Sequence, residues 1–244
     1  MSDTNQAIEH APLLSPKFVW KVTAIVGLLC AVTLAIAITG RMVGGTIALA
    51  GNTTDQSLRE IVIGNDVLIF PANVIRFESQ RVSGVQNVVD TYFAWPGMAG
   101  YTEANRAIFN QTDSAASLIF ARITQATMSR DMSGRLNPIY QRLTDGHRVA
   151  GPNGLDSMRL RSGAGYANEL LYVEHSVTDN PYAVRCLVED AQTQPDFSTR
   201  TGCQRDISLG EGLSVTYRFA IELLPNWREI ERDVRARFEA ALAH

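Results

Sequence analysis

The sequence predicts an α+β protein, in which one N-terminal transmembrane helix precedes a mainly antiparallel β-sheet domain with a C-terminal amphipathic helix. Three observations predict this class. An uncharged apolar run lies near the N-terminus, at residues 22–39. Short segments of alternating apolar and polar residues follow, and the longest covers residues 213–223. After Pro225, apolar residues recur at the spacing of one helix face.

The apolar run is long enough to cross a membrane. Residues 22–39 carry no charge, and with Phe18, Val19 and Trp20 they reach the ~20 residues that span ~30 Å of hydrocarbon. Lys17 and Lys21 precede the run, whereas Arg41 alone follows it closely. Because positive residues favour the cytoplasmic side, we expect a cytoplasmic N-terminus and an uncleaved signal-anchor in the inner membrane.

A cleaved signal peptide is the main alternative to an anchor. Its charged N-terminal region would contain Asp3 and Glu9, which is unusual for such a peptide. The small-residue site at Ala48 and Ala50 lies too far downstream of the apolar run. A buried core helix is also disfavoured, since the run is apolar on every side. We favour the anchor, and cleavage remains an open alternative.

One face of the predicted span is made of small residues spaced four apart. They are Thr23, Gly27, Ala31, Ala35 and Thr39. Small side chains let two membrane helices approach closely, so this stripe predicts a homodimer through the span. Small residues are also simply common in such spans, which is the competing interpretation.

The sequence divides into four parts. We expect a cytoplasmic tail at 1–17, the transmembrane anchor at 18–40, a glycine-containing tether at 41–57 and an extracytoplasmic α+β domain at 58–244. The formal net charge of −3 gives no basic field that would attract nucleic acid. The expected partners are the membrane itself and another envelope protein.

The domain is predicted to consist of short strands and three helical regions. A tight hairpin is predicted at 60–70, with Gly64 and Asn65 at its turn. Further strands are predicted at 74–77, 88–95, 118–123, 170–176, 182–188, 204–209 and 213–223. Helical character is predicted at 102–110 and 128–143, and a long loop at 144–168 that contains one short strand at 158–160. The last helix carries a core-facing stripe of Trp227, Ile230, Val234, Phe238 and Leu242.

Two cysteines lie outside the predicted span. Cys186 shares its alternation face with Val184 and Val188, and Cys203 immediately precedes the next strand. The segment between them contains Pro195 and Gly202 and must double back. In an oxidising compartment this pair predicts a disulfide, which would stabilise the fold by ~3 kcal/mol. Two unrelated buried thiols are the alternative.

No catalytic, cofactor or metal motif stands out in the sequence. His175 follows Glu174 in a predicted strand, and a hydrolase would need further groups brought to this pair by the fold. A partly buried structural histidine is the simpler interpretation. The sequence predicts no catalytic residues, no bound cofactor and no metal site.

The segment from Tyr92 to Tyr101 groups four aromatic residues around a Pro-Gly turn. Tyr92, Phe93, Trp95 and Tyr101 are typical of a shallow stacking surface for a ligand or protein partner. The same residues equally suit a strand end that folds into the core. The sequence is compatible with both interpretations.

The segments FAWPGMAGYT (93–102) and CQRDISLGEGLSVTYRF (203–219), with the anchor, resemble those of uncharacterised single-pass transmembrane-anchored envelope proteins of α-proteobacteria. This resemblance implies an inner-membrane anchor and a periplasmic domain, and it brings no catalytic residues. We expect a non-enzymatic envelope protein with a periplasmic interaction or accessory domain. The alternatives are a membrane-anchored hydrolase and a small-ligand sensor, whose tail would be too short to signal alone.

Overall fold

The computed structural model describes residues 16–49, 51–110, 117–161, 163, 165–166, 168–175, 180–187 and 202–243. The chain forms two compact units, Met1–Ala50 and Gly51–His244. Most of the expected cytoplasmic tail lies outside the described residues. The class expected from the sequence is confirmed: an apolar N-terminal helix, a large antiparallel sheet and a C-terminal helix.

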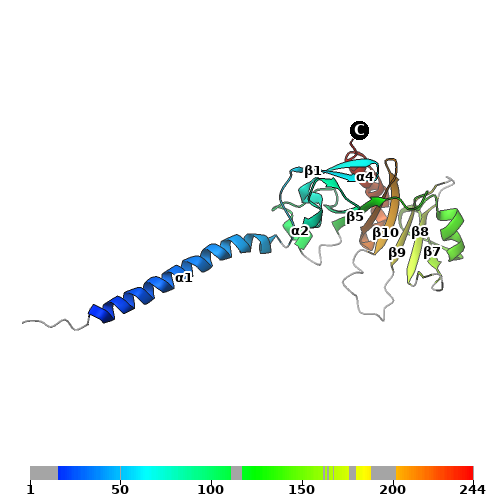
Figure 1. Ribbon diagram of the computed structural model, residues 1–244. Helices are drawn as coiled ribbons and strands as arrows, with labels where there is room; N and C mark the ends of the chain where they lie inside the picture. Colours follow the sequence, from blue (N-terminus) through cyan, green and yellow to red (C-terminus); the bar gives the residue numbers. More distant parts are fainter. Residues whose placement is uncertain are drawn as a thin grey trace, which may run out of the picture. The chain divides into compact units, whose positions relative to one another are not determined.

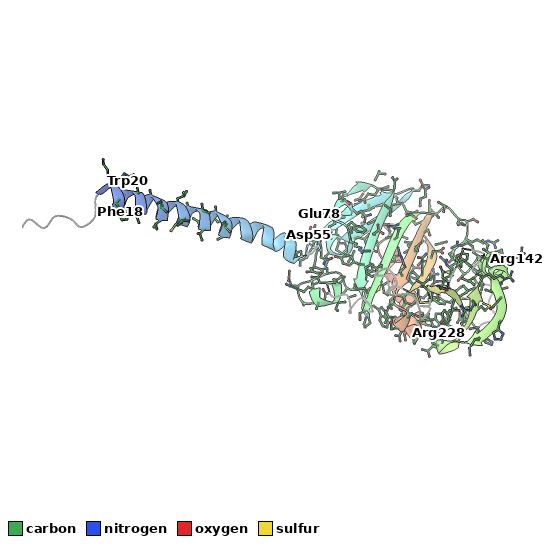
Figure 2. The ribbon with its side chains drawn as sticks, turned by 90° about the horizontal axis from the view of Figure 1, so that it is seen from below. Phe18, Trp20, Asp55, Glu78, Arg142 and Arg228 are labelled. Atoms are coloured by element: carbon green, nitrogen blue, oxygen red, sulfur yellow. A yellow bond between two sulfur atoms is a disulfide. The ribbon has the colours of Figure 1, made fainter. Side chains whose placement is uncertain are left out.

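The first unit is a single helix, α1 (Pro16–Ala48), drawn in blue in Figure 1. Its segment Lys17–Ile38 is long and apolar enough to cross a membrane. Apolar side chains project from this helix on every side, with Phe18 and Trp20 near its N-terminal end (Figure 2). The helix continues to Ala48, so the first part of the expected tether is helical.

The small-residue stripe remains a prediction. Thr23, Gly27, Ala31 and Ala35 are all exposed on α1, whereas the side chain of Thr39 lies outside the described residues. The Thr23 hydroxyl donates a hydrogen bond to the Val19 carbonyl four residues earlier, at 2.9 Å. This bond satisfies the hydroxyl within the helix, as lipid surroundings require.

The second unit is built on an eight-stranded antiparallel sheet with the strand order β4-β5-β11-β10-β9-β8-β7-β6. Its strands are β4 (Val88–Ala94), β5 (Leu118–Gln125), β6 (Thr144–Ala150), β7 (Leu155–Leu160), β8 (Glu169–Glu174), β9 (Ala183–Leu187), β10 (Cys203–Leu209) and β11 (Leu213–Phe219). Alternation places one face of each strand inward and the other outward. Leu213, Val215, Tyr217 and Phe219 are buried on β11, as its period-two pattern predicts.

A second, three-stranded sheet has the order β2-β1-β3 and consists of β1 (Leu58–Ile63), β2 (Asp66–Pro71) and β3 (Gly84–Val85). The predicted hairpin is confirmed, and Gly64 takes the positive φ of 61° that the turn demands. The strand predicted at 74–77 is reduced to one bridge between Ile75 and Thr91. A 3-10 turn at Ala72–Val74 directly after Pro71 breaks the extended backbone there.

Helix α4 (Trp227–Glu239) closes the main core, as its sequence stripe predicts. Trp227, Ile230, Val234 and Phe238 are buried, and Leu242 is partly buried. The Phe238 ring meets Phe70 of β2 at 5.8 Å and Phe93 of β4 at 5.9 Å between ring centroids. The helix therefore joins the two sheets in one core.

A smaller core lies on the opposite face of the sheet, at β7 to β9. The helical turns Leu136–Tyr140 and α3 (Gln141–Leu143) cover it. Its buried residues are Met132, Leu136, Tyr140, Met158, Leu160, Leu171, Val173 and Ala183. A short helix, α2 (Arg106–Asn110), lies within the helix predicted at 102–110.

Two expectations about local structure were wrong. The region predicted at 144–168 as a loop with one short strand at 158–160 contains the hairpin β6–β7: the short strand lies within β7, whereas β6 was missed because its six residues after Thr144 are exposed and give no alternating pattern. The strand predicted to reach Leu223 ends at Phe219, since a 3-10 helix, Ile221–Asn226, leads directly into α4. In both places tertiary packing rather than periodicity sets the boundary.

Candidate functional site

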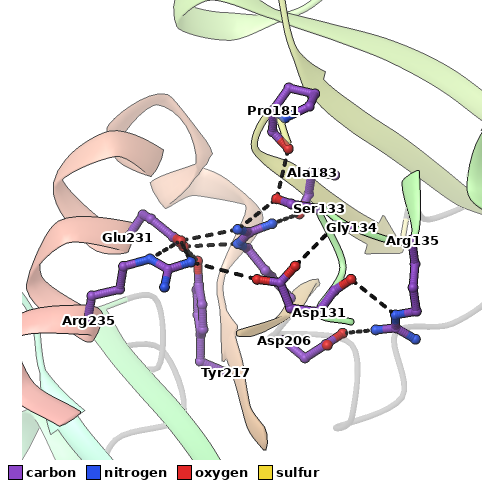
Figure 3. Close-up of polar contacts among 11 residues, drawn as sticks. Asp131, Ser133, Gly134, Arg135, Pro181, Ala183, Asp206, Tyr217, Glu231 and Arg235 are labelled. Atoms are coloured by element: carbon purple, nitrogen blue, oxygen red, sulfur yellow. Dashed lines mark hydrogen bonds and ion pairs between the residues drawn. The ribbon is translucent and has the colours of Figure 1, made fainter. Parts of the chain in front are cut away.

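A buried ionic cluster lies between the sheet and α4. We call Arg205, Glu231, Tyr217 and Ser133 the polar clamp (Figure 3). Arg205 of β10 is only 3% exposed, and its Nε and Nη2 donate to the two Glu231 carboxylate oxygens at 2.9 and 3.1 Å. Tyr217 of β11 donates its hydroxyl hydrogen to the same carboxylate. The clamp therefore fastens α4 to two neighbouring strands.

The clamp also holds the segment that follows β5. Arg205 Nη2 donates to Ser133 Oγ at 3.1 Å, and the Ser133 hydroxyl donates to the Pro181 carbonyl at 2.8 Å. Arg205 Nη1 donates to the Ala183 carbonyl at 2.7 Å. A buried guanidinium is costly unless its donors are matched in this way. The arrangement is a satisfied structural network.

The environment of the clamp fixes the charge of its members. Burial raises the pKa of Glu231, but the Arg205 guanidinium beside it has the opposite effect and holds the pKa below the ordinary glutamate value. Burial raises the pKa of the Tyr217 phenol well above its ordinary value. Glu231 is therefore ionised and Tyr217 protonated at neutral pH, as the hydrogen bond from Tyr217 to Glu231 requires.

A cleft of about 660 Å³ opens beside the clamp. Its lining consists of Arg130, Asp131, Ser133, Gly134, Glu174, Asn180, Tyr182, Arg205, Ser208, Trp227, Glu231 and Arg235. Three arginines and three acidic residues line it, so the cleft is charged but nearly neutral in sum. It suits a ligand that presents both signs of charge.

Aromatic rings form one wall of the cleft. The Tyr182 ring lies 4.4 Å from the Trp227 ring, and the Arg205 guanidinium lies 4.6 Å from the Tyr182 centroid. Burial raises the pKa of Tyr182, so its hydroxyl stays protonated. That hydroxyl is buried and makes no hydrogen bond within the described part of the chain. A buried donor without a partner costs free energy in the folded state.

Ion pairs extend from the clamp toward the rim of the cleft. Arg235 Nε donates to Glu231 Oε1 at 2.7 Å, and Arg235 also lies 3.9 Å from Asp131. Arg135 pairs with Asp206 on the outer face of the sheet. These contacts anchor the 130–135 segment at both ends of the cleft wall and limit its movement.

The aromatic segment predicted as a surface lies mostly in the interior. Tyr92, Phe93 and Tyr101 are 3%, 0% and 0% exposed, and Trp95 is partly buried against the core. Phe93 faces Phe238, while Tyr92 and Tyr101 both pack edge-on against Phe109 of α2. The structure therefore corrects the exposed stacking surface, because three of its four rings are core residues.

The predicted disulfide is present. Cys186 of β9 and Cys203 of β10 are bonded, and the two residues lie directly opposite each other in the sheet. Arg205 of β10 donates to the Ala183 carbonyl of β9, so the disulfide cross-links two strands that the polar clamp also joins. In chain-entropy terms a loop of this length is worth ~3 kcal/mol.

The Glu174–His175 pair does not form one site. Neighbouring strand residues point to opposite faces. Glu174 pairs with Arg228 of α4 at 3.7 Å, whereas His175 Nδ1 lies 3.0 Å from Asp156 with 79% of its side chain exposed. No group of three or more His, Cys, Asp or Glu that could hold a metal occurs within the described ranges.

Sequence reasoning missed the polar clamp, although a signal was present. Arg205 occupies an inward position in the alternation of β10, between Cys203 and Ile207. Glu231 is four residues from Trp227, at the border of the apolar stripe of α4. Opposite charges at two otherwise apolar positions predict a buried pair, but their contact depends on tertiary packing. Glu231 also pairs with Arg235 one turn further along α4.

The fold is similar to those of two bacterial proteins. Smlt3025, an immunity protein of the Stenotrophomonas maltophilia type IV secretion system, matches with a TM-score of 0.50 and 16% identity, covering 78% of this chain and 94% of that chain. The Neisseria meningitidis iron-regulated outer membrane lipoprotein FrpD matches with a TM-score of 0.46 and 12% identity, covering 78% and 98%. No protein-family model and no curated protein matches the chain. At 16% identity the likeness to Smlt3025 shows a shared fold.

Proposed function

We propose that this chain is a non-enzymatic envelope protein, anchored in the inner membrane, whose periplasmic unit binds a protein partner. The apolar helix α1 and the two lysines at its N-terminal flank support the anchor and its orientation. The fold shared with a secretion-system immunity protein supports an envelope-associated role. A membrane-anchored hydrolase and a small-ligand sensor are the alternatives.

The cleft beside the polar clamp carries the proposal. Protein interfaces favour aromatic and arginine side chains at their centres, and here Trp227, Tyr182 and Arg130 line the hollow. Glu231 neutralises Arg205 inside the polar clamp, whereas Arg130 is exposed and its charge is available to a partner. The disulfide and the polar clamp hold the cleft walls in place, so little conformational freedom is lost when a partner binds there.

Photo-crosslinking in living cells tests the cleft. We would place a photoreactive amino acid at the exposed positions Arg130 and Asn180, and at Val149 of β6 as a matched exposed control. The expected result is one discrete adduct at the two cleft positions that is absent at Val149. Reversing the charge with Arg130→Glu should weaken the adduct formed at Asn180. Equal labelling at all three positions would contradict the proposal.

The orientation has a separate test. Alkaline phosphatase fused after His244 is expected to be active, because the enzyme matures only outside the cytoplasm. A green fluorescent protein fused at the same position is the matched control and should stay dark. A fluorescent fusion with inactive phosphatase would place the folded unit in the cytoplasm and overturn the assignment of sides.

A further inference from the structure

The small sheet presents an apolar face outward. In β1 the buried residues Ile61 and Ile63 point into the core, so Leu58, Glu60 and Val62 point away from it. Cross-strand register carries the same outward side to the neighbouring strands. The set comprises Leu58, Glu60, Val62, Val67, Ile69, Pro71 and Val85, which we call the apolar sheet face.

Part of this face is open to solvent. Val85 is 83% exposed, Leu58 66% and Ile69 37%, whereas Val62, Val67 and Pro71 are half-buried. Val82, in the loop before β3, is also 56% exposed. Glu60 is the single charged member of the set. Contiguous exposed apolar residues of this kind mark contact with a protein or a membrane.

The outward face of the large sheet is different. Arg122, Thr124, Ser214, Thr216 and Arg218 of β5 and β11 alternate outward there, and Phe120 is the one large apolar residue among them. Water therefore suits the outer side of β5 and β11, whereas the same side of β7 to β9 is covered by the smaller core. The apolar sheet face lacks such polar cover, and its exposure is a local property of β1 to β3.

The covalent link limits how far the apolar sheet face can lie from a membrane that holds α1. The candidate span ends at Ile38 and α1 continues to Ala48, about 15 Å further at 1.5 Å per residue. Residues 49–57 can then cover at most about 30 Å before Leu58 begins β1. Leu58 is itself a member of the face, so a bilayer that holds α1 lies within its reach.

We propose that the apolar sheet face docks on the lipid surface of the membrane in which α1 is anchored. The proposal rests on the membrane anchoring proposed above. The apolar side chains of the apolar sheet face insert at the boundary between headgroups and acyl chains, while Glu60 reaches the headgroups. Because the tether makes the encounter intramolecular, a modest apolar area suffices to hold the face on the lipid.

Fluorescence quenching in liposomes tests the docking with the full chain. A Cys30→Ser background removes the free thiol, and Val85→Cys or Arg218→Cys then carries an environment-sensitive dye. The liposomes contain phosphatidylethanolamine and phosphatidylglycerol, with a quencher attached to a fraction of the lipids. We expect about twofold quenching for the dye at position 85 and little for the dye at position 218, which sits on the polar outer face.

Charge substitutions on the apolar sheet face provide the second part of the liposome experiment. Adding Leu58→Asp and Ile69→Asp, both at exposed positions, should abolish the quenching at position 85 while the disulfide stays formed. A dye at position 85 that stays solvent-like in lipid overturns the docking. A blue-shifted dye that is not quenched by lipid, and that reverts when the protein is diluted in the bilayer, assigns the face to a second copy and also overturns it.

The same samples separate this inference from the anchoring on which it rests. Washing the liposomes at alkaline pH releases proteins that only adhere to the surface. Release of the chain would refute the anchor, whereas a retained chain without quenching at position 85 would refute the docking alone.

Discussion

Helices α1 and α4 both depend on apolar side chains, but they distribute them differently. In α1 the apolar residues surround the axis, and they are exposed between Phe18 and Ile38. In α4 they form one stripe, which is buried, and charged residues such as Arg232 and Asp233 occupy the rest. The first pattern requires an apolar solvent on all sides and the second an apolar partner on one side. Distribution around the axis, more than total hydrophobicity, decides between lipid and core.

The two helices also differ in how they treat charge. The apolar stretch of α1 contains no charged residue. Helix α4 carries Glu231 at the edge of its buried stripe and tolerates it because Arg205 and Tyr217 reach it from the sheet. A protein interior can supply partners for a charge, whereas lipid tails cannot. The following predictions test this difference.

The largest effect is expected in α1. Leu28→Arg combined with Ile36→Arg places two charges in the hydrocarbon, at a combined cost of about 5–7 kcal/mol to insertion. The chain should move from the membrane pellet to the soluble or degraded fraction after alkaline extraction. Trp20→Arg, near the headgroup end of the same helix, is the control and should stay in the pellet. Full retention of the double variant would mean that α1 does not cross the membrane.

A smaller loss is expected in the core stripe of α4. Phe238→Ala removes a ring that contacts both Phe70 and Phe93, and should lower the free energy of unfolding by about 3–5 kcal/mol. Denaturant titration of the full chain in detergent measures this. Arg232→Ala on the exposed side of the helix should change stability by about 0.5 kcal/mol or less. Similar losses in both variants would show that α4 does not pack as described.

The polar clamp should contribute less than the apolar stripe. Glu231→Gln keeps the shape of the side chain but leaves Arg205 without a counter-charge, and should lower the free energy of unfolding by about 2–3 kcal/mol. Glu222→Gln, an exposed neighbour at the start of the preceding 3-10 helix, is the control. If Glu231→Gln matches this control, the clamp carries no net stabilisation.

The same clamp predicts a pH dependence. Since the folded pKa of Glu231 lies below its ordinary value, its stabilisation is fully present above the ordinary glutamate pKa. It is lost as the pH falls through the lowered folded pKa. Stability measured across this acidic window should therefore fall more steeply in the parent chain than in Glu231→Gln. Parallel curves would indicate that Glu231 does not titrate against Arg205.

The smallest effect is expected at the small-residue stripe of α1. Gly27→Ile should weaken self-association of the span by about 1 kcal/mol, because the larger side chain separates the two helix backbones. A membrane dimerisation assay of the full span measures this, with Leu28→Ile on the neighbouring face as the control. Equal association in both variants would remove the stripe as a dimer interface.

Local patterns in the sequence predicted most of the second unit. The hairpin of β1 and β2, strand β11 and the stripe of α4 each have a clear periodicity, and each is confirmed. The disulfide followed from the inward direction of Cys186 and the position of Cys203 before a strand. Strand β6 escaped notice because it is exposed on both sides after Thr144. An alternating pattern arises where one face of a strand is buried. An edge strand that is exposed on both faces therefore shows no such pattern.

The candidate site was harder to predict. The aromatic cluster at Tyr92 to Tyr101 was obvious in the sequence, yet its rings pack inward against Phe109 and Phe238. The cleft draws on α4, β8 to β10 and the 130–135 segment, which are far apart in the chain. Composition identifies aromatic residues but not the direction in which a strand end turns, and that direction depends on the neighbours it meets.

The sequence alone determined the membrane-compatible helix, the alternating strands and the amphipathic last helix, because each follows from the spacing of apolar residues within one segment. The tertiary structure decided which charges became partners, where the cleft opened and which sheet face stayed bare. Arg205 and Glu231 lie far apart in the sequence, and the fold brings them together as an ion pair. The reason is physical: the energy of a buried charge depends on groups brought from distant parts of the chain.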